Sequence, residues 1–521
     1  MTASDPISAA SKSASISPSL TSTAVAGGAW IAVQVAVNKA VALLGTLAVM
    51  YLLTPHDYGL ASLALSVMAG FALLPPFTLS DVLIATPNDV ELRMRMAIRI
   101  CAVYTALTVL AIAAVSPLIA RYFMEPDLMV ACWWVALRPV VDLLVLAPQT
   151  RLRLRLDFRR IAVIDAITQI GATVSSIGMA ALGYGYLSLI LPQIAATAGR
   201  ALLYSRAAGS SPRSSGRDHR STSEMVHQYI ASGMGQYIHA GMLTIVPFVI
   251  AHYSDEIQTG LYAMAFSLSA ATNGIVAVSL GMVLQPVFAR MAGDTERQAG
   301  AFVRACSAIA VLAMPLLALQ CLLSRAAFAE LLPPRWEGAV VMAQLLCAGY
   351  AFYFPVNPAM GLLKAQGKFW SFFWWQFGHF LVVTALMLLV GEYAGESASV
   401  YIVAVLSFSQ VVFSPVGVIL CTPRGEWIKS CVSVYAAPMG GALVSVLPPF
   451  FAIAVLVPEG KVCNWLQMII VPLVALPIYW AWIRLFAKVP AAELSSAFRA
   501  IKERLVVPVK AISPSHADTG C

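Results

Sequence analysis

Apolar and polar segments alternate along the chain at a spacing that suits membrane helices. Apolar runs recur from residue 24 to residue 487. Each holds roughly 20 residues, enough for a helix to cross a hydrocarbon core about 30 Å thick. Short polar turns such as Thr54-Pro55-His56-Asp57-Tyr58-Gly59 separate them. The pattern predicts fourteen transmembrane helices, at residues 24–53, 58–84, 97–119, 128–148, 161–182, 185–206, 226–252, 258–288, 301–323, 337–363, 369–391, 397–421, 431–457 and 464–487.

The composition agrees with an all-α integral membrane protein. Hydrophobic residues make up 60% of the 521 positions and charged residues 11%, whereas soluble domains carry about 25% charged residues. Residues 1–23 are rich in Ser, Ala and Thr and hold one basic residue, Lys12, so they lack the basic start of a signal peptide and are expected to form a disordered cytoplasmic tail. The nine cysteines form no CxxC pair, which argues against a disulfide framework or a zinc site.

The basic residues orient the predicted helices. Lys and Arg in short loops stay on the cytoplasmic side of a membrane. With the N-terminus inside, 27 of the 33 basic residues fall in inside segments, Lys39 and Arg138 fall within spans, and only Arg121, Arg325, Arg335 and Lys461 fall outside. Both termini are therefore predicted to be cytoplasmic. The net charge of +8 then reflects membrane topology and not nucleic-acid binding, and RLRLRLDFRR at 151–160 is interpreted as a basic loop at an anionic leaflet.

Two sequence echoes indicate an internal repeat. Placing residue 59 on residue 260 aligns GLASLALS with GLYAMAFS, and LRLRLDF at 152–158 resembles LLKAQGKF at 362–369. Each echo joins helices that are six apart in the series. Because six is even, the repeats would be parallel and pseudo-symmetric about an axis along the membrane normal. The predicted organisation is a six-helix N-lobe, a cytoplasmic linker, a six-helix C-lobe, two C-terminal helices and a cytoplasmic C-terminal tail, at 24–207, 208–225, 226–421, 431–487 and 488–521.

Several segments resemble one family of transporters. They are LLTPHDYGLASLALSVMAGF (52–71), RLRLDFRRIAVIDAI (153–167), LGYGYLSLILPQIAATAGRALL (182–203), TGLYAMAFSLSAATNGIVAVSLGMVLQPVFARMAGD (259–294), PLLALQCLLSRAAFAELLPPRWEGAVVMAQLLCAGYAF (315–352) and GLLKAQGKFW (361–370). In this order and spacing they are similar to the polysaccharide transporter (Wzx-type) flippases of the multidrug/oligosaccharidyl-lipid/polysaccharide (MOP) exporter superfamily. The resemblance covers most of residues 30–380 and is strongest to the branch that serves exopolysaccharide, colanic-acid-like and teichuronic-acid-like pathways.

The resemblance implies a substrate, a location and a fold. The substrate would be an oligosaccharide on undecaprenyl diphosphate, moved from the cytoplasmic to the periplasmic leaflet of a bacterial inner membrane for exopolysaccharide or lipopolysaccharide biosynthesis. Membrane lipids, H⁺ or Na⁺, and other polysaccharide-assembly membrane proteins are the remaining expected partners. Two six-helix lobes would surround a cleft, and the last two helices would receive the lipid tail.

The sequence offers no enzyme motif. It contains no GxxxxGK[ST] phosphate loop, no HExxH and no suitably placed DxD, and the predicted outside loops are about a dozen residues or shorter. A membrane polymerase or glycosyltransferase would need a large loop or acidic motifs. We therefore expect a transporter without catalytic residues, cofactor or metal, driven by an ion gradient or a substrate gradient.

Polar residues within the predicted spans are the candidates for binding. A diphosphate crossing the bilayer needs a polar, usually cationic, cavity. Lys39 falls near the centre of the first span beside Asn38 and Gln34. By the internal repeat, Gln236 and His239 occupy the corresponding part of the seventh predicted span, at 226–252. These residues are interpreted as substrate ligands in the cleft, with His239 also a candidate for proton coupling; a buried Lys bonded to Asn38 and a packed His are the open alternatives.

The fourth span supplies a second pair. Arg138 and Asp142 are four residues apart and share a helix face, so they can form an ion pair. Pro139 could turn the Arg138 guanidinium toward the cleft, where its fork suits phosphate oxygens. Asp142 is the acidic candidate for ion coupling, and it keeps a multidrug/cation exporter of the same fold open as the alternative function. A lipid II flippase is a second alternative within the same class. Two further carboxylates, Asp81 and Asp165, are interpreted as interfacial. The remaining polar candidates could bind sugar hydroxyls or form hydrogen bonds between helices: Asn273, Gln285 and Asn357.

Overall fold

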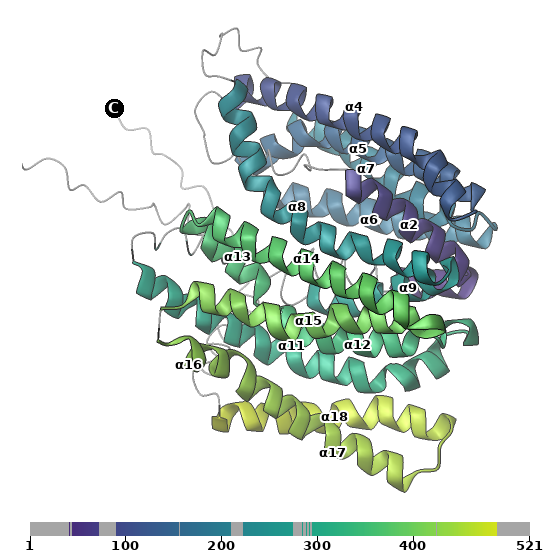
Figure 1. Ribbon diagram of the computed structural model, residues 1–521, viewed down its shortest axis with the longest axis vertical. Helices are drawn as coiled ribbons and strands as arrows, with labels where there is room; N and C mark the ends of the chain where they lie inside the picture. Colours follow the sequence, from purple (N-terminus) through teal and green to yellow (C-terminus); the bar gives the residue numbers. More distant parts are fainter. Residues whose placement is uncertain are drawn as a thin grey trace, which may run out of the picture.

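A computed structural model describes residues 44–71, 90–155, 157–209, 222–274, 294–423 and 425–486, with the single residues 41, 284, 288 and 291. Within these ranges the regular secondary structure is helical, with no strand (Figure 1). The helices of the first half are α2 (Pro55–Phe71), α4 (Val90–Tyr122), α5 (Pro126–Leu154), α6 (Phe158–Ala181), α7 (Leu187–Ala208) and α8 (Thr222–Tyr253). Those of the second half are α9 (Glu256–Asn273), α11 (Thr295–Leu331), α12 (Ala339–Tyr353), α13 (Val356–Ala365), α14 (Phe369–Tyr393), α15 (Ala398–Cys421), α16 (Trp427–Cys431), α17 (Ala437–Leu456) and α18 (Lys461–Phe486).

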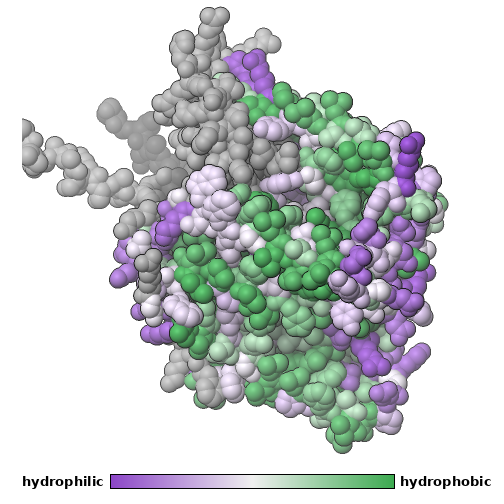
Figure 2. Space-filling view, in the orientation of Figure 1, coloured by the Kyte–Doolittle hydropathy of each residue, from purple (hydrophilic) through white to green (hydrophobic). Residues whose placement is uncertain are grey.

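The hydrophobic surface confirms a multi-pass membrane protein. Ten helical segments among the described residues are long and apolar enough to cross a bilayer. Figure 2 shows hydrophobic side chains gathered over the middle of the visible face, with hydrophilic ones along the right-hand end and in patches at the left. Large apolar side chains such as Val174, Leu389 and Val455 are exposed on the surface of the bundle, as expected where lipid is the solvent.

The described helices follow the order of the predicted series, but several begin or end at other residues: α4 begins at Val90 and not at 97, and α5 ends at Leu154 and not at 148. The helix predicted at 301–323 is α11, which runs for 37 residues. The span predicted at 337–363 is interrupted at Phe354-Pro355 and forms α12 and α13. The span predicted at 431–457 contains a π-helical stretch, Val432–Ala436, before α17. Most of the first predicted span lies outside the described residues, so the count of fourteen stays a prediction.

The helices pack in two groups that meet along α2. In the first group α5 packs against α4 and α7, and α6 packs against α7. In the second, α12 packs against α9, α11 and α15, while α14 packs against α8 and α15. Helix α2 contacts α5 of the first group and both α8 and α9 of the second. We call this contact of α2 with α8 and α9 the α2 seam.

Helices α17 and α18 form a separate hairpin on the second group. They pack against each other and against α11, and in Figure 1 they lie at the lower edge of the molecule, far from α4. An apolar cluster that includes Leu319 of α11, Val446 of α17 and Val471 of α18 fills the contact. These two helices therefore lie outside both groups; that they do not belong to the repeat stays a prediction.

The bundle has two distinct ends. One end holds short turns, at 53–54, 123–125, 182–186 and 254–255, and we call it the short-turn end; it lies on the right in Figure 1. The opposite end carries Arg151, Arg153 and Lys368, and we call it the basic end. The distribution of basic residues predicts that the short-turn end is periplasmic and the basic end cytoplasmic.

The repeat seen in the sequence recurs in backbone hydrogen bonds. Where α5 ends, the N–H of Asp157 donates to the carbonyl of Leu152 at 3.1 Å; where α13 ends, the N–H of Lys368 donates to that of Leu363 at 2.8 Å. Both residue numbers differ by 211 between the two sites. The same bond in the same register forms a helix C-terminal cap of the Schellman type. The second sequence echo therefore reflects a repeated local structure.

Candidate functional site

The first candidate site is the point where α2 and α9 cross near the short-turn end. A Cβ atom on Gly59 would overlap the carbonyl oxygen of Glu256 and lie 2.9 Å from its carbonyl carbon. A Cβ atom on Gly260 would overlap the carbonyl oxygen of Pro55 and lie 3.0 Å from the nitrogen of Gly59. The two backbones can approach this closely only because both positions are glycine. The glycines of the first sequence echo therefore hold the α2 seam closed at this end.

A loop of the second group fastens the same end. Residues Pro334–Trp336 form a turn of 3₁₀ helix after α11. The indole N–H of Trp336 donates to the carbonyl of Met50 at 2.9 Å, and the Arg335 guanidinium donates to the carbonyls of Met50 and Tyr51 at 3.1 and 2.5 Å. The Trp336 ring also meets Tyr58 of α2 edge-on, with centroids 5.2 Å apart. Trp336 is fully buried, so these contacts join the helix ending at Leu52 to the second group.

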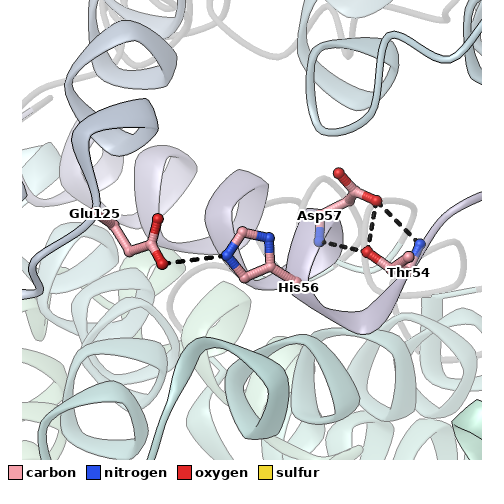
Figure 3. A network of polar contacts seen from close by, with 4 residues as sticks. All are labelled: Thr54, His56, Asp57 and Glu125. Carbon is pink, nitrogen blue, oxygen red and sulfur yellow. Dashed lines mark hydrogen bonds and ion pairs between the residues drawn. The ribbon is translucent and has the colours of Figure 1, made fainter.

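The polar turn at 54–57 is mainly a helix cap (Figure 3). Thr54 precedes α2, and its hydroxyl and N–H donate to Asp57 Oδ2 at 2.6 and 3.0 Å, while the N–H of Asp57 donates to Thr54 Oγ1 at 3.3 Å. This reciprocal capping box satisfies N–H groups that a helix start leaves unpaired. Helix α2 thus begins at Pro55, and the predicted six-residue turn is only two residues long.

His56 and Glu125 form a second contact at this turn. His56 Nε2 lies 3.3 Å from Glu125 Oε1, and their side chains are 41% and 27% exposed. Figure 3 shows the imidazole pointing toward Glu125 and away from the Thr54–Asp57 cap. An ion pair with this exposure contributes little to stability. The turn offers neither a metal cluster nor a catalytic constellation, and no group of three metal-ligating side chains occurs among the described residues.

The second candidate site is a set of charged side chains on α5 and α7. No hydrogen-bonded ion pair joins Arg138 and Asp142 in the described part of the chain, although both lie on α5 as predicted. The Asp142 carboxylate instead lies within electrostatic range of two guanidinium groups, those of Arg138 and of Arg200 on the adjoining α7. All three side chains are half-buried. The arrangement carries a net positive charge within membrane-spanning helices.

Arg200 is a residue that the sequence reasoning missed, because it counted Arg200 among the basic residues of the inside segments. It lies thirteen residues after Leu187, where α7 begins, or about 20 Å along the helix. Its Nη2 donates to Thr197 Oγ1 at 2.9 Å, and its buried Nε has no hydrogen-bond partner among the described residues. Its depth in the predicted span at 185–206 was the signal that could have identified it.

Asp165 is held by a neighbouring helix. The hydroxyl of Tyr204, a fully buried residue of α7, donates to Asp165 Oδ1 at 2.6 Å. Asp165 lies on α6, seven residues after its first residue, Phe158. The carboxylate therefore helps to join α6 to α7, which supports a structural role over a free interfacial charge.

The second group buries a polar cluster that was also missed. His379 of α14 lies 3.0 Å from Ser409 Oγ of α15 and stacks on Phe413 at a centroid distance of 4.3 Å. Ser414 donates to Gln410 Oε1 at 3.2 Å in the same helix. The imidazole is 3% exposed. A histidine in the middle of an apolar run was the available sequence signal.

The remaining candidates cannot be placed as side chains. Lys39, Asn38 and Gln34 lie outside the described residues. Gln236 and His239 belong to α8, but their side chains are outside the described part. Their proximity to one another and to a cleft stays a prediction. Of the other polar candidates, Asn273 ends α9 with a buried Oδ1 that has no hydrogen-bond partner within the described part of the chain.

Comparison with known families decides the family of the chain. The model of Polysacc_synt_3, described as polysaccharide biosynthesis protein, matches residues 49–341, which is more than half of the 521 residues. The chain belongs to this polysaccharide biosynthesis protein family. The match includes both glycines of the α2 seam and the Arg335–Trp336 loop. A search of curated protein sequences gives no significant match.

Solved structures identify the fold of this family member. The lipid II flippase MurJ in an inward closed conformation is 13% identical and superposes with a TM-score of 0.66, covering 87% of this chain and 98% of that one. A multidrug resistance MATE family transporter of the MOP superfamily, in an inward-facing conformation, is 11% identical with a TM-score of 0.54, covering 75% and 95%. The family member therefore has the MOP transporter fold, as the sequence resemblance implied.

Proposed function

We propose that this protein is a flippase that moves a polyprenyl-diphosphate-linked oligosaccharide from the cytoplasmic to the periplasmic leaflet. The observation that carries the proposal is the match to the polysaccharide biosynthesis family over residues 49–341. The fold likeness to a lipid II flippase agrees with it. The substrate would supply exopolysaccharide or lipopolysaccharide biosynthesis in a bacterial inner membrane, and the protein acts without covalent catalysis.

The packing supports alternating access between two lobes. The groups that meet at the α2 seam are the two proposed lobes, residues 24–207 and 226–421. Their contact at the short-turn end, through Gly59, Gly260 and Trp336, gives a state closed toward the periplasm if that end faces outward. Transport then requires this contact to separate while the basic end closes.

The charged side chains suit the substrate better than they suit a cation. A diphosphate carries negative charge, and a guanidinium binds phosphate oxygens with paired donors. Arg138 and Arg200 lie near Asp142, and the predicted position of Lys39 adds a third cation. Together they form the proposed headgroup path, with Gln34, Asn38 and Gln236 as sugar partners. Asp142 and His239 stay the proposed groups for coupling to H⁺ or Na⁺.

A cation exporter is the second candidate. Asp142 is a half-buried carboxylate within a membrane-spanning helix, and a carboxylate in such a place is a functional candidate by default. The fold likeness to a multidrug resistance transporter is compatible with that role. Two guanidinium groups beside the carboxylate oppose cation binding, so we favour the flippase.

Locating the lipid-linked saccharide tests the proposal. Cells that lack the protein are expected to accumulate short lipid-linked repeat units on the cytoplasmic leaflet. Enzymatic or chemical labelling from the periplasmic side, in spheroplasts compared with lysed membranes, reports the leaflet. Repeat units that reach the periplasmic leaflet unpolymerised would point to a polymerase instead. If the amount and the leaflet of the lipid-linked repeat units do not change but the drug sensitivity of the cells does, the exporter is favoured.

A further inference from the structure

An apolar crevice crosses the α2 seam. Its volume is about 240 Å³, and its lining includes Gly70 of α2, Tyr237, Gly241 and Phe248 of α8, and Phe377 and Phe380 of α14. None of these lining residues is fully buried, so the crevice is open on one side. Gly241 lies twelve residues before the end of α8, and Gly70 fifteen after the start of α2. These positions are about 18 and 22 Å from the short-turn end, at or below mid-membrane.

The polar groups of this lining are already satisfied. The Tyr237 hydroxyl donates to the carbonyl of Gly70, across the seam, and Thr244 Oγ1 donates to the carbonyl of Ala240 at 2.7 Å. The remaining lining side chains are hydrocarbon. Among the described lining residues a sugar or a diphosphate therefore finds no free donor, and it would lose its hydration without compensation. The lining suits a hydrocarbon chain.

A stripe of aromatic rings leads from the basic end to the crevice. Trp370 and Trp374 of α14 are 64% and 61% exposed. The Phe373 ring lies 5.4 Å from Trp370, 5.1 Å from Trp374 and 5.7 Å from Phe377, which lines the crevice. The exposed cation Lys368 stands directly before α14, so the stripe starts beside a positive charge.

We propose that this crevice, and not the α17–α18 hairpin to which the sequence resemblance assigned the lipid tail, holds the polyprenyl chain of the lipid-linked substrate. The inference rests on the proposed function, because it assumes that the headgroup travels between the lobes while its chain stays in the bilayer. A chain in that situation must leave the protein along a seam between the lobes, and the crevice lies on the α2 seam. Lys368 complements the diphosphate at the basic end, and the aromatic stripe covers the chain between the charge and the crevice. Bulk phospholipid is not expected to bind at the seam more than at other apolar faces.

Photo-crosslinking of the full-length protein in native membranes tests the occupant. A photoreactive phenylalanine analogue replaces Phe380 in the crevice, and in the control it replaces Phe408 of α15, which is 62% exposed and is not among the residues that line the crevice. Mass spectrometry identifies the adducts. We expect polyprenyl adducts to be severalfold more abundant at position 380 than at 408. Phospholipid adducts alone at 380, or equal polyprenyl yields at both positions, would overturn the proposal.

Filling the crevice tests its role in transport. A Cβ on Gly70 would meet no heavy atom within 4 Å, and one on Gly241 would only touch Phe380 at 4.0 Å. Gly70→Leu and Gly241→Leu therefore place side chains in the open space and are expected to lower polysaccharide export severalfold at unchanged protein level. The control is Gly171→Leu on the exposed surface of α6, where a Cβ also meets nothing within 4 Å. Normal export by both crevice variants contradicts the inference.

The two proposals fail in different ways. If deletion leaves lipid-linked units on the cytoplasmic leaflet but position 380 yields no polyprenyl adduct, the crevice proposal alone is wrong. If deletion leaves their distribution unchanged, the flippase proposal is wrong and the crevice loses its ligand. Photo-crosslinking does not depend on export, so it decides the occupant even where a Leu variant fails to accumulate.

Discussion

Gly59 and Gly260 make the same contact in opposite directions. The carbonyl of Glu256 lies against Gly59 and the carbonyl of Pro55 lies against Gly260, and both glycines are 201 residues from their counterparts, as Pro55 is from Glu256. Gly59 of α2 therefore packs on the first residue of α9, and Gly260 of α9 packs on the first residue of α2. Such a reciprocal contact follows a local pseudo-twofold axis, and it explains why GLASLALS aligns with GLYAMAFS.

Gly59→Ala and Gly260→Ala are each expected to open the short-turn end. The added methyl group would overlap a backbone carbonyl, which cannot rotate away, so the helices must separate at a cost of about 1–3 kcal/mol. We expect reduced export and faster modification of a cysteine introduced at Ser66, a buried position of α2, by an impermeant thiol reagent added outside.

Gly171→Ala is the matched control, since a Cβ there meets no heavy atom within 4 Å. It should leave both export and thiol labelling unchanged. Wild-type behaviour in both seam variants would show that the crossing does not limit transport. Labelling of Ser66→Cys from the cytoplasmic side alone would reverse the predicted orientation.

The Arg335–Trp336 loop gives a second prediction for the same end. Trp336→Phe keeps a ring beside Tyr58 but removes the indole donor to Met50. It should therefore lower the free energy of unfolding of the purified protein by about 1 kcal/mol, which a lower melting temperature would report. Arg335→Ala removes two further bonds to helix-end carbonyls and should act in the same direction. Arg325→Ala, at an exposed position of α11, is the control. Equal melting temperatures in all variants would contradict the role of this loop.

The turn at 54–57 allows a cap to be compared with an ion pair. Asp57→Ala removes the acceptor of two bonds in the capping box and should cost about 0.5–2 kcal/mol of unfolding free energy. His56→Ala removes an exposed ion pair and should cost less than about 1 kcal/mol. Thermal unfolding of the two variants in detergent shows which substitution destabilises the protein more. A larger loss with His56→Ala would assign the histidine a role that its exposure does not explain.

Much of this architecture could be predicted from local sequence, and the contacts that close it could not. Apolar runs and turn residues placed the helices because their cause lies within about 20 residues. Thr54 and Asp57 even show the capping pattern, although the start of α2 at Pro55 was not predicted. The bond from Arg335 to Met50 joins residues 285 apart, and only the packed structure identifies that pair. Arg200 was missed because a count of basic residues cannot separate a deep arginine from one in a loop.

The charged set on α5 and α7 predicts unequal effects of similar substitutions. Arg200→Lys keeps the charge but loses the guanidinium fork and its bond to Thr197, so we expect intermediate export, with Arg200→Gln lower. Asp142→Asn should preserve substrate binding but weaken the response of transport to a collapsed ion gradient. Transport measured in vesicles with and without an ionophore separates the two effects. An unchanged ionophore response would remove Asp142 from coupling.

Lys39 provides the sharpest test of a residue that sequence alone identified. Its predicted place near the bilayer centre is costly for a cation unless the charge is used or paired. Lys39→Ala is expected to cut polysaccharide export while the amount of protein in the membrane stays unchanged, and Lys39→Arg should restore part of it because the charge returns. Lys12→Ala, in the predicted tail, is the control. Export measured from whole cells, normalised to protein level, decides the outcome: normal export in Lys39→Ala removes Lys39 from the mechanism, whereas loss in both Ala and Arg variants indicates that the shape of the lysine, and not its charge alone, matters.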